Sequence, residues 1–281
     1  MLSPFLAAAW ISLRSYQREA AFYTPRRYEI ALDEAAALPA SRAVEFEAVT
    51  GTVKGWYSTP TNGAAIVLVH GSAGDRRAVL GEAAVLAGEG YGVLLIDMPG
   101  HGGSSGDVDW SDGGRSAVAA ALDFLSLQPD VDPGRLGALG TSMGGFIVAQ
   151  VAATDDRLGA VALIGAPHDQ DEVTRWENRR YGPFSEIPAI WAMERGGLPR
   201  DDRPPIEEID EISPRAVLVV GGSDDRLVTP DFSRRLFAAA RQPKEFVLVD
   251  GAGHSDHLDA GGDAFRDTLL RFFGDHLLDA V

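Results

Sequence analysis

Short uninterrupted apolar runs alternate with helical stretches along most of this chain, and this alternation restricts the possible folds more than any other feature. The apolar runs are residues 64–69, 93–96, 136–139, 160–164, 216–220 and 246–249. The intervening helical stretches are residues 76–89, 115–127, 146–153, 231–240 and 264–278. A strand that is apolar on both faces is typical of a parallel sheet covered on both sides. Repeated strand–helix units therefore predict an α/β fold with a mostly parallel central sheet and helices on both faces.

The chain divides into three parts according to where the alternation of apolar runs and helical stretches begins and where it is interrupted. Residues 44–166 and 213–281 are predicted to form the core, opened by an antiparallel pair of strands joined by a turn at Thr50-Gly51. Residues 167–212 contain many charges, several prolines and large aromatics but no buried-strand run, which predicts a small cap inserted between two strands. Residues 1–43 are predicted to be a helical arm and linker.

The first part of the arm differs in charge from the rest of the protein, because it has four arginines and a single acidic residue, Glu19. Leu6, Trp10 and Leu13 recur at helical spacing, and Pro25 would end such a helix. The pattern fits a helix packed on its own domain or on a second subunit of a homodimer. It also fits a helix that lies on a membrane surface.

Composition excludes several classes of function. The 25 Lys and Arg against 41 Asp and Glu give a net charge of −16, which repels phosphate backbones, so no nucleic-acid partner is expected. The chain has no cysteine, which excludes disulfides, thiolate zinc sites and a cysteine nucleophile. No run approaches the roughly 18 apolar residues of a membrane span. A cytoplasmic location is favoured.

The strongest chemical signal is the sequence GTSMGG at residues 140–145. It follows an apolar run and precedes a helical stretch, which is the context that a nucleophile elbow requires. Ser142 would then lie on a sharp strand-to-helix turn that needs small neighbours. The alternative is a glycine-rich turn in which Ser142 only caps the helix.

A serine nucleophile needs a base and an orienting acid, and both can follow later strands. The run at residues 216–220 leads to Asp224 and Asp225, either of which could be the acid or could cap a turn. The last apolar run leads into a glycine-rich loop with His254, and His257 is its competitor as base. The order Ser, Asp, His after three separate strands is more specific than any single motif.

Two further loops complete the candidate site. The first apolar run ends in His70-Gly71-Ser72, where Gly71 allows close approach of the backbone. The backbone N–H groups of Ser72 and Met143 are the expected oxyanion donors, and His70 is expected to be structural. The glycine-rich loop at residues 97–106 has no following lysine, so it is expected to support the floor of the site and not to bind phosphate.

These motifs, in this order over residues 44–281, resemble the α/β-hydrolase superfamily and particularly its soluble serine esterases and lipase-like members. In that family the acid commonly stands three residues after a glycine and three before a valine, which selects Asp225. Two departures stand out. The triple-glycine oxyanion loop of the hormone-sensitive-lipase-like branch is missing, and so is the cysteine nucleophile of the dienelactone hydrolases, which the sequence otherwise resembles. A haloalkane dehalogenase is similar too, but it has Asp where Ser142 stands.

The resemblance implies a carboxylic ester hydrolase with the catalytic triad Ser142, His254 and Asp225 and no cofactor or metal. Small to medium apolar substrates are expected, with Trp176, Tyr181 and Trp191 of the cap lining the pocket. A thioesterase, an amidase or a C–C bond hydrolase would use the same machinery, and a non-catalytic binding protein of the same fold is the alternative outside enzymes.

Overall fold

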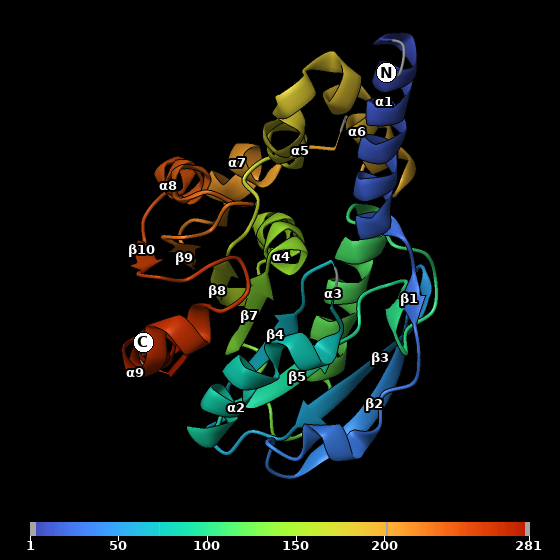
Figure 1. The fold of residues 1–281 in the computed structure, drawn as a ribbon. Coiled ribbons are helices and arrows are strands. Elements are labelled where there is room, and N and C mark those ends of the chain that lie inside the picture. Colours follow the sequence, from blue (N-terminus) through green and yellow to red (C-terminus); the bar gives the residue numbers. More distant parts are fainter. Residues whose placement is uncertain (1–3, 73, 201, 279–281) are drawn as a thin grey trace.

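The computed structural model describes residues 4–72, 74–200 and 202–278. Its centre is an 8-stranded sheet in the order β10-β9-β8-β7-β4-β5-β3-β2, drawn with its helices in Figure 1. The strands are β2 (Ser41–Ala48), β3 (Gly51–Ser58), β4 (Ala65–Val69), β5 (Gly92–Ile96), β7 (Leu136–Thr141), β8 (Leu158–Ile164), β9 (Ala216–Gly222) and β10 (Lys244–Val249). From β5 to β10 every neighbouring pair is parallel, whereas β2 and β3 form an antiparallel opening. The predicted fold class is confirmed.

Helices cover both faces of the sheet because its central strands are apolar on both sides. On β7, Ala138 belongs to one apolar cluster and Leu139 to the other, as expected for side chains that alternate between faces. The first cluster includes α3 (Asp112–Ser126), α4 (Met143–Thr154) and α8 (Pro230–Ala239). The second includes α2 (Leu80–Gly88), which follows the short turn η3 (Arg76–Val79), and α9 (His257–Phe273).

The last predicted helix, which starts at residue 264, corresponds to the second part of α9. The helix α9 begins at His257, but Gly262 within it has non-helical backbone angles, with φ 51°, so two helical segments meet there at a kink. The first of these segments was not predicted. The π-helical turn η6 (Gly274–Leu278) ends the described chain.

In the described residues of the segment between β8 and β9, the regular elements are all helical and are joined by short loops. It contains α5 (Gln170–Asn178), η4 (Arg179–Tyr181), α6 (Pro183–Arg195), α7 (Pro205–Glu208) and η5 (Ile209–Ile212). We call residues 167–212 the cap segment. Figure 1 shows α5 and α6 at one end of the molecule together with the N-terminal helix.

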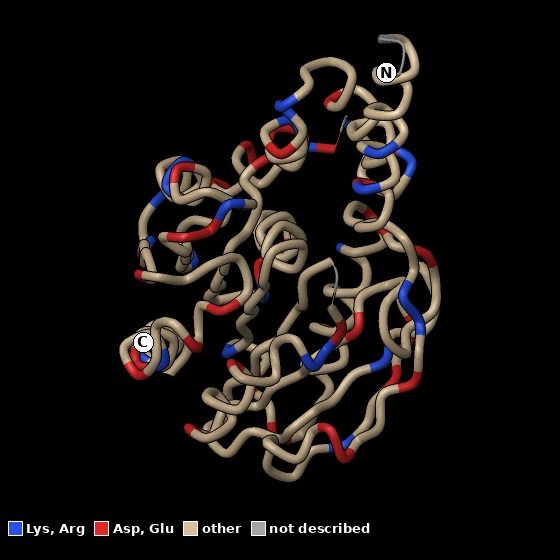
Figure 2. The backbone as a smooth tube through the Cα atoms, viewed as in Figure 1, with Lys and Arg blue, Asp and Glu red and all other residues tan. Residues whose placement is uncertain are grey.

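The N-terminal helix α1 (Pro4–Ala20), extended by η1 (Ala21–Tyr23), packs against α6 of the same chain. The Ser12 hydroxyl donates to the carbonyl of Phe184 at 2.8 Å, and Arg18 donates to the Asn178 side chain at 3.0 Å. The arginines of α1 lie in its second half (Figure 2), and its first half exposes Phe5 and Trp10. Packing on its own domain was one of the predicted arrangements. Contact of the exposed face with a membrane or a second subunit stays a prediction.

Three smaller elements complete the fold. The strands β1 (Arg26–Arg27) and β6 (His101–Gly102) form a two-stranded parallel sheet that ties the linker to the loop after β5. The turn η2 (Leu32–Ala35) follows on the linker. In the ranges that the structure describes, no helix combines the length and hydrophobicity needed to cross a bilayer.

Candidate active site

Ser142 lies on the sharp turn between β7 and α4. Its backbone has φ 51° and ψ −118°, a conformation that costs a non-glycine residue free energy and persists where the surroundings impose it. The surroundings are tight, since a Cβ on Gly140 would lie 2.3 Å from the carbonyl oxygen of Gly144. The Ser142 side chain makes no capping hydrogen bond to α4, so the alternative of a mere helix cap does not describe it.

His254 joins the nucleophile to the acid. Its Nε2 is 2.8 Å from Ser142 Oγ, and its Nδ1 is 2.8 Å from Asp225 Oδ2. A carboxylate can only accept, so Nδ1 carries the proton and Nε2 is left to accept from the serine hydroxyl. The structure thus brings the three residues together in one hydrogen-bonded chain, with the Asp225 side chain fully buried.

Asp225, and not Asp224, reaches the imidazole. The second oxygen of Asp225 accepts from the backbone N–H groups of Leu227 and Val228 at 2.8 and 2.9 Å, which fixes the carboxylate plane. Asp224 is exposed, and its backbone N–H donates to the carbonyl of Ala252 at 2.9 Å. The two neighbours therefore point in different directions from one turn, and the one that reaches the imidazole is Asp225, which the family resemblance had selected.

The two predicted oxyanion donors lie beside the nucleophile. Met143 is the first residue of α4, and such an N–H has no partner within its helix. A Cβ on Gly71 would lie 3.2 Å from the Ser142 Cβ, which places the Ser72 loop against the nucleophile. The buried His101 ring contacts the Ser72 carbonyl through Nε2 at 2.8 Å and the Pro99 carbonyl through Nδ1 at 3.0 Å. His101 thus fixes the Ser72 loop, a contact that the sequence did not reveal.

Two other histidines near the site have different surroundings. His70 is fully buried, and its Nε2 accepts from the Met98 N–H at 3.0 Å, which holds two loops together. Burial lowers the pKa of His70 to about 3, so it stays neutral, as befits the structural role expected of it. His257 is buried at the start of α9, and burial lowers its pKa as well. It is His254, and not His257, whose Nε2 accepts the hydrogen bond from the Ser142 hydroxyl.

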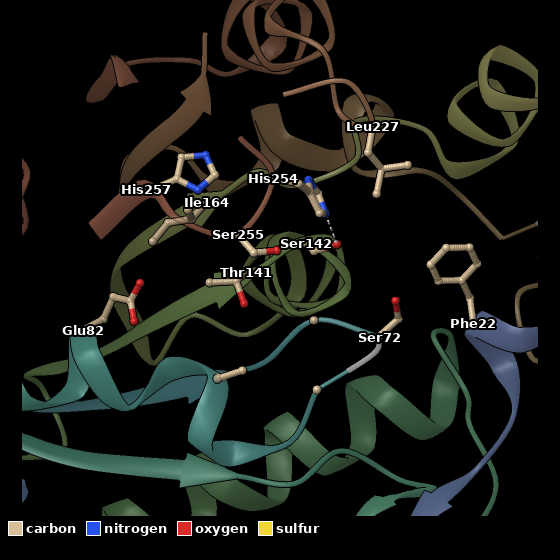
Figure 3. A pocket seen from close by; sticks show the side chains of 13 residues that line it. Phe22, Ser72, Glu82, Thr141, Ser142, Ile164, Leu227, His254, Ser255 and His257 are labelled. Atoms are coloured by element: carbon tan, nitrogen blue, oxygen red, sulfur yellow. Dashed lines mark hydrogen bonds between the residues drawn. The ribbon is translucent and has the colours of Figure 1, made fainter. Parts of the chain in front are cut away.

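The main cavity beside Ser142 has a volume of about 310 Å³, within the range of small-ligand sites. Figure 3 shows Phe22 and Leu227 on one side of Ser142 and Glu82 and His257 on the other. Apolar and polar side chains are mixed around the cavity, since Ile164 lies on the side of His257 and Ser72 on the side of Phe22. Burial raises the pKa of Glu82, which favours its neutral form.

A second, narrower cavity of about 20 Å³ adjoins Ser142 on the side of α1 and α5. Its walls include Glu19, Phe22, Trp110 and Glu177. The N-terminal helix thus supplies part of the active-site wall, which the sequence did not predict. The available signal was Glu19, the one acidic residue in a basic segment.

The predicted pocket residues Trp176, Tyr181 and Trp191 do not line either of these cavities, and this expectation is corrected. Trp176 packs edge-on against Phe232, while Tyr181 and Trp191 are 47% and 59% exposed. The physical reason is the position of α1, which packs against the cap helix α6 and brings Phe22 to the site instead.

No group of three or more His, Asp and Glu that could hold a metal ion occurs within the described part of the chain.

Comparison with known proteins agrees with this geometry. Residues 64–189 match a family model described as the alpha/beta hydrolase fold. An uncharacterised protein of Mycobacterium tuberculosis, Rv2307c, is 34% identical over 245 residues, which are 84% of this chain and 80% of the relative. The chain belongs to the α/β-hydrolase family.

Two other similarities are more distant. The polyketide transferase ATR5 of Stachybotrys chlorohalonatus is 27% identical, over 82% of this α/β-hydrolase and 95% of the relative. The crystal structure of the esterase Pf2001 of Pyrococcus furiosus superposes with a TM-score of 0.75 at 16% identity, covering 90% of this chain and 98% of the other. At such identity the latter shows the fold alone.

Proposed function

We propose that this α/β-hydrolase is a serine esterase that cleaves carboxylic esters of small to medium apolar substrates. The observation that carries the proposal is the continuous chain of two 2.8 Å hydrogen bonds from Ser142 through His254 to Asp225. A serine hydroxyl is a weak nucleophile, and a neutral imidazole at this distance is the base that activates it.

The proposed reaction has two half-reactions. Ser142 Oγ attacks the ester carbonyl carbon while His254 Nε2 takes the hydroxyl proton, and the ionised Asp225 stabilises the resulting imidazolium. The N–H groups of Ser72 and Met143 donate to the oxyanion. His254 then gives its proton to the departing alcohol oxygen, which leaves an acyl group on Ser142. A water molecule, deprotonated by His254, repeats the attack and releases the carboxylic acid.

The preference for apolar substrates is supported by the walls of the main cavity. Apolar surface close to Ser142 comes from Phe22, Ile164 and Leu227. An acyl or alkyl chain that bound there would bury its apolar surface away from water, which favours binding. The volume of about 310 Å³ favours small to medium groups over long lipid chains. The net charge of −16 further disfavours anionic substrates.

Thioesters, amides and activated C–C bonds could react through the same residues. A non-catalytic binding protein of the same fold would turn over none of these substrates. A panel of p-nitrophenyl esters from acetate to octanoate, with matched thioesters and anilides, separates these possibilities. We expect the short and medium esters to have the highest kcat/KM. Turnover of thioesters or anilides with esters untouched would reject the esterase assignment.

The matched variants are Ser142→Ala and Ser126→Ala. Ser126 lies at the end of α3 and donates to the Leu122 carbonyl, so its loss tests for indirect effects of removing a hydroxyl. We expect Ser142→Ala to fold and to lose ester turnover, and Ser126→Ala to retain it. Retained turnover in a folded Ser142→Ala protein would refute the mechanism.

A further inference from the structure

Two carboxylates lie in the wall of the narrow cavity that adjoins the nucleophile. Glu19 of α1 and Glu177 of α5 both line it, as does Ser142. The proposed triad already contains its acid, Asp225, so these carboxylates have no part in the acyl-transfer steps. Their presence next to a largely apolar cleft calls for a different explanation.

Glu19 is only 2% exposed, and its hydrogen bonding is incomplete. One oxygen accepts from the Thr174 hydroxyl at 3.2 Å. The other oxygen, Oε2, is buried and has no hydrogen-bond partner within the described residues. A buried acceptor without a donor destabilises the protein, so such an atom is a place where a ligand's donor can bind.

The charged groups around Glu19 do not compensate its negative charge. Burial, and then the nearby Glu177, raise the pKa of Glu19 to about 7, while the Thr174 hydroxyl, Arg18 and the Asn178 side chain act in the opposite direction. Arg18 is exposed and donates to Asn178 at 3.0 Å. Tyr23, the other titratable group that faces Glu19, is held neutral because burial raises its pKa. A bound cation would relieve both the burial and the repulsion of the two carboxylates.

Glu177 links this cavity to the catalytic residues. Burial raises its pKa as well, and the charges that act on it include Arg18, His254 and Asp225. Trp110 also lines the cavity and offers an aromatic wall. An ammonium group is attracted by carboxylates and by aromatic faces alike.

We propose that the natural substrate carries an ammonium group, which binds between Glu19 and Glu177 while the ester carbonyl lies at Ser142. The proposal rests on the esterase function proposed above and names its substrate class: an ester with an apolar body and one basic amine. The narrow cavity, with a volume of about 20 Å³, has room for a group about the size of a water molecule, such as a primary ammonium, and the net charge of −16 attracts cations.

The test compares near-isosteric esters that differ in one terminal group. On the acyl side, p-nitrophenyl 3-aminopropanoate is paired with the butanoate, and the 6-aminohexanoate with the heptanoate. On the alcohol side, 5-aminopentyl butanoate is paired with hexyl butanoate. The measured quantity is the ratio of kcat/KM between the members of each pair. We expect the ratio to favour the ammonium ester on at least one side.

Three variants show whether the carboxylates cause this preference. Glu19→Gln and Glu177→Gln should each lower the ratio by about tenfold or more, the usual effect of losing a charged hydrogen bond. Glu186→Gln is the matched control, because Glu186 is a carboxylate of the same cap that lines neither cavity. An equal drop with Glu186→Gln, or no drop with both Glu19→Gln and Glu177→Gln, would overturn the proposal.

The pH dependence of the kcat/KM ratio distinguishes a binding role of Glu19 from a purely structural one, because a structural role would affect both esters of a pair alike. Glu19 gains its charge as pH rises through about 7, whereas an alkylammonium group stays charged there. The ratio should therefore rise between pH 6 and pH 8 in the wild type, and it should rise less in Glu19→Gln, where Glu177 is the remaining carboxylate. Taking a ratio cancels the titration of the catalytic groups common to both esters.

A binding measurement separates failure of this proposal from failure of the esterase assignment. Isothermal titration calorimetry with n-hexylammonium and 1-hexanol requires no turnover. Tighter binding of the ammonium that is lost in Glu19→Gln would support the cation site even if no ester were cleaved. Equal binding of the two probes, with esters turned over, would reject the cation site and leave the esterase intact.

Discussion

Replacing Asp225 by Asn changes one atom type at the centre of the proposed triad, and its effect can be worked out from the hydrogen bonds. Oδ1 of Asp225 accepts from the N–H groups of Leu227 and Val228 at 2.8 and 2.9 Å. A substituted amide that put its NH2 group there would leave two buried donors unpaired, at about 1–3 kcal/mol each. The amide oxygen therefore stays with these donors.

The NH2 group of the variant then faces His254 Nδ1, which must accept. The imidazole proton moves to Nε2, and Nε2 donates to Ser142 Oγ instead of accepting from it. The base is present in the wrong tautomer, and the rate should fall by a factor on the order of 10⁴. That factor equals about 5.5 kcal/mol of activation free energy.

The assay is kcat/KM for p-nitrophenyl butanoate, with circular dichroism to show that each variant folds. Asp224→Asn is the matched control, because Asp224 is exposed and its side chain accepts a long hydrogen bond from the neighbouring Ser223 hydroxyl, at 3.5 Å. We expect it to change the rate by less than about twofold, as surface substitutions usually do. A large loss in Asp224→Asn together with an active Asp225→Asn would refute this reasoning.

The remaining predictions concern the oxyanion loop, the N-terminal helix and the cap. Gly71→Ala should lower kcat/KM by about tenfold, because its Cβ would press on the Ser142 Cβ at 3.2 Å and displace the nucleophile; an unchanged rate would contradict the tight loop. Phe22→Ala should change the preference among acyl lengths and Trp191→Ala should not, since only Phe22 of the two lines the cavities; the reverse result in an ester panel would restore the original pocket assignment. For Glu19 the folded pKa of about 7 exceeds its ordinary 4.5, so the folded state binds more protons between these values and this residue's contribution to stability falls as pH rises. Glu19→Gln should therefore gain stability relative to wild type between pH 5 and pH 8, by about 3 kcal/mol at most, and Glu186→Gln should not; equal pH dependence in denaturant unfolding of wild type and Glu19→Gln would contradict the buried charge.

The sheet and the triad could be predicted because their signals are local. A strand buried on both faces must be apolar throughout, as residues 65–69 and 92–96 are, and the nucleophile elbow needs small residues on either side of Ser142. The choice of Asp225 over Asp224 depended on a family pattern. Its physical basis, the N–H groups of Leu227 and Val228, became visible only in the structure.

The pocket could not be predicted because it depends on packing between distant segments. Aromatic residues in the cap segment suggested that they line the pocket, but the sequence does not show which face of each cap helix is buried and which is exposed to solvent. On α6 the inward face is Ala189, Ile190 and Met193, and Trp191 points to solvent. Phe22 reaches the site because α1 packs on α6, a contact between residues more than 150 positions apart.

Covalent labelling of Ser142 tests the central claim most directly. A fluorophosphonate probe reacts with a serine only when a base and oxyanion donors activate it, so labelling reports the assembled triad without reference to any substrate. Mass spectrometry of the digested protein should find one phosphonylated peptide, the one that contains Ser142, and no adduct in a folded Ser142→Ala variant. An unlabelled wild-type protein, or an adduct that persists at the same rate in Ser142→Ala, would contradict the account.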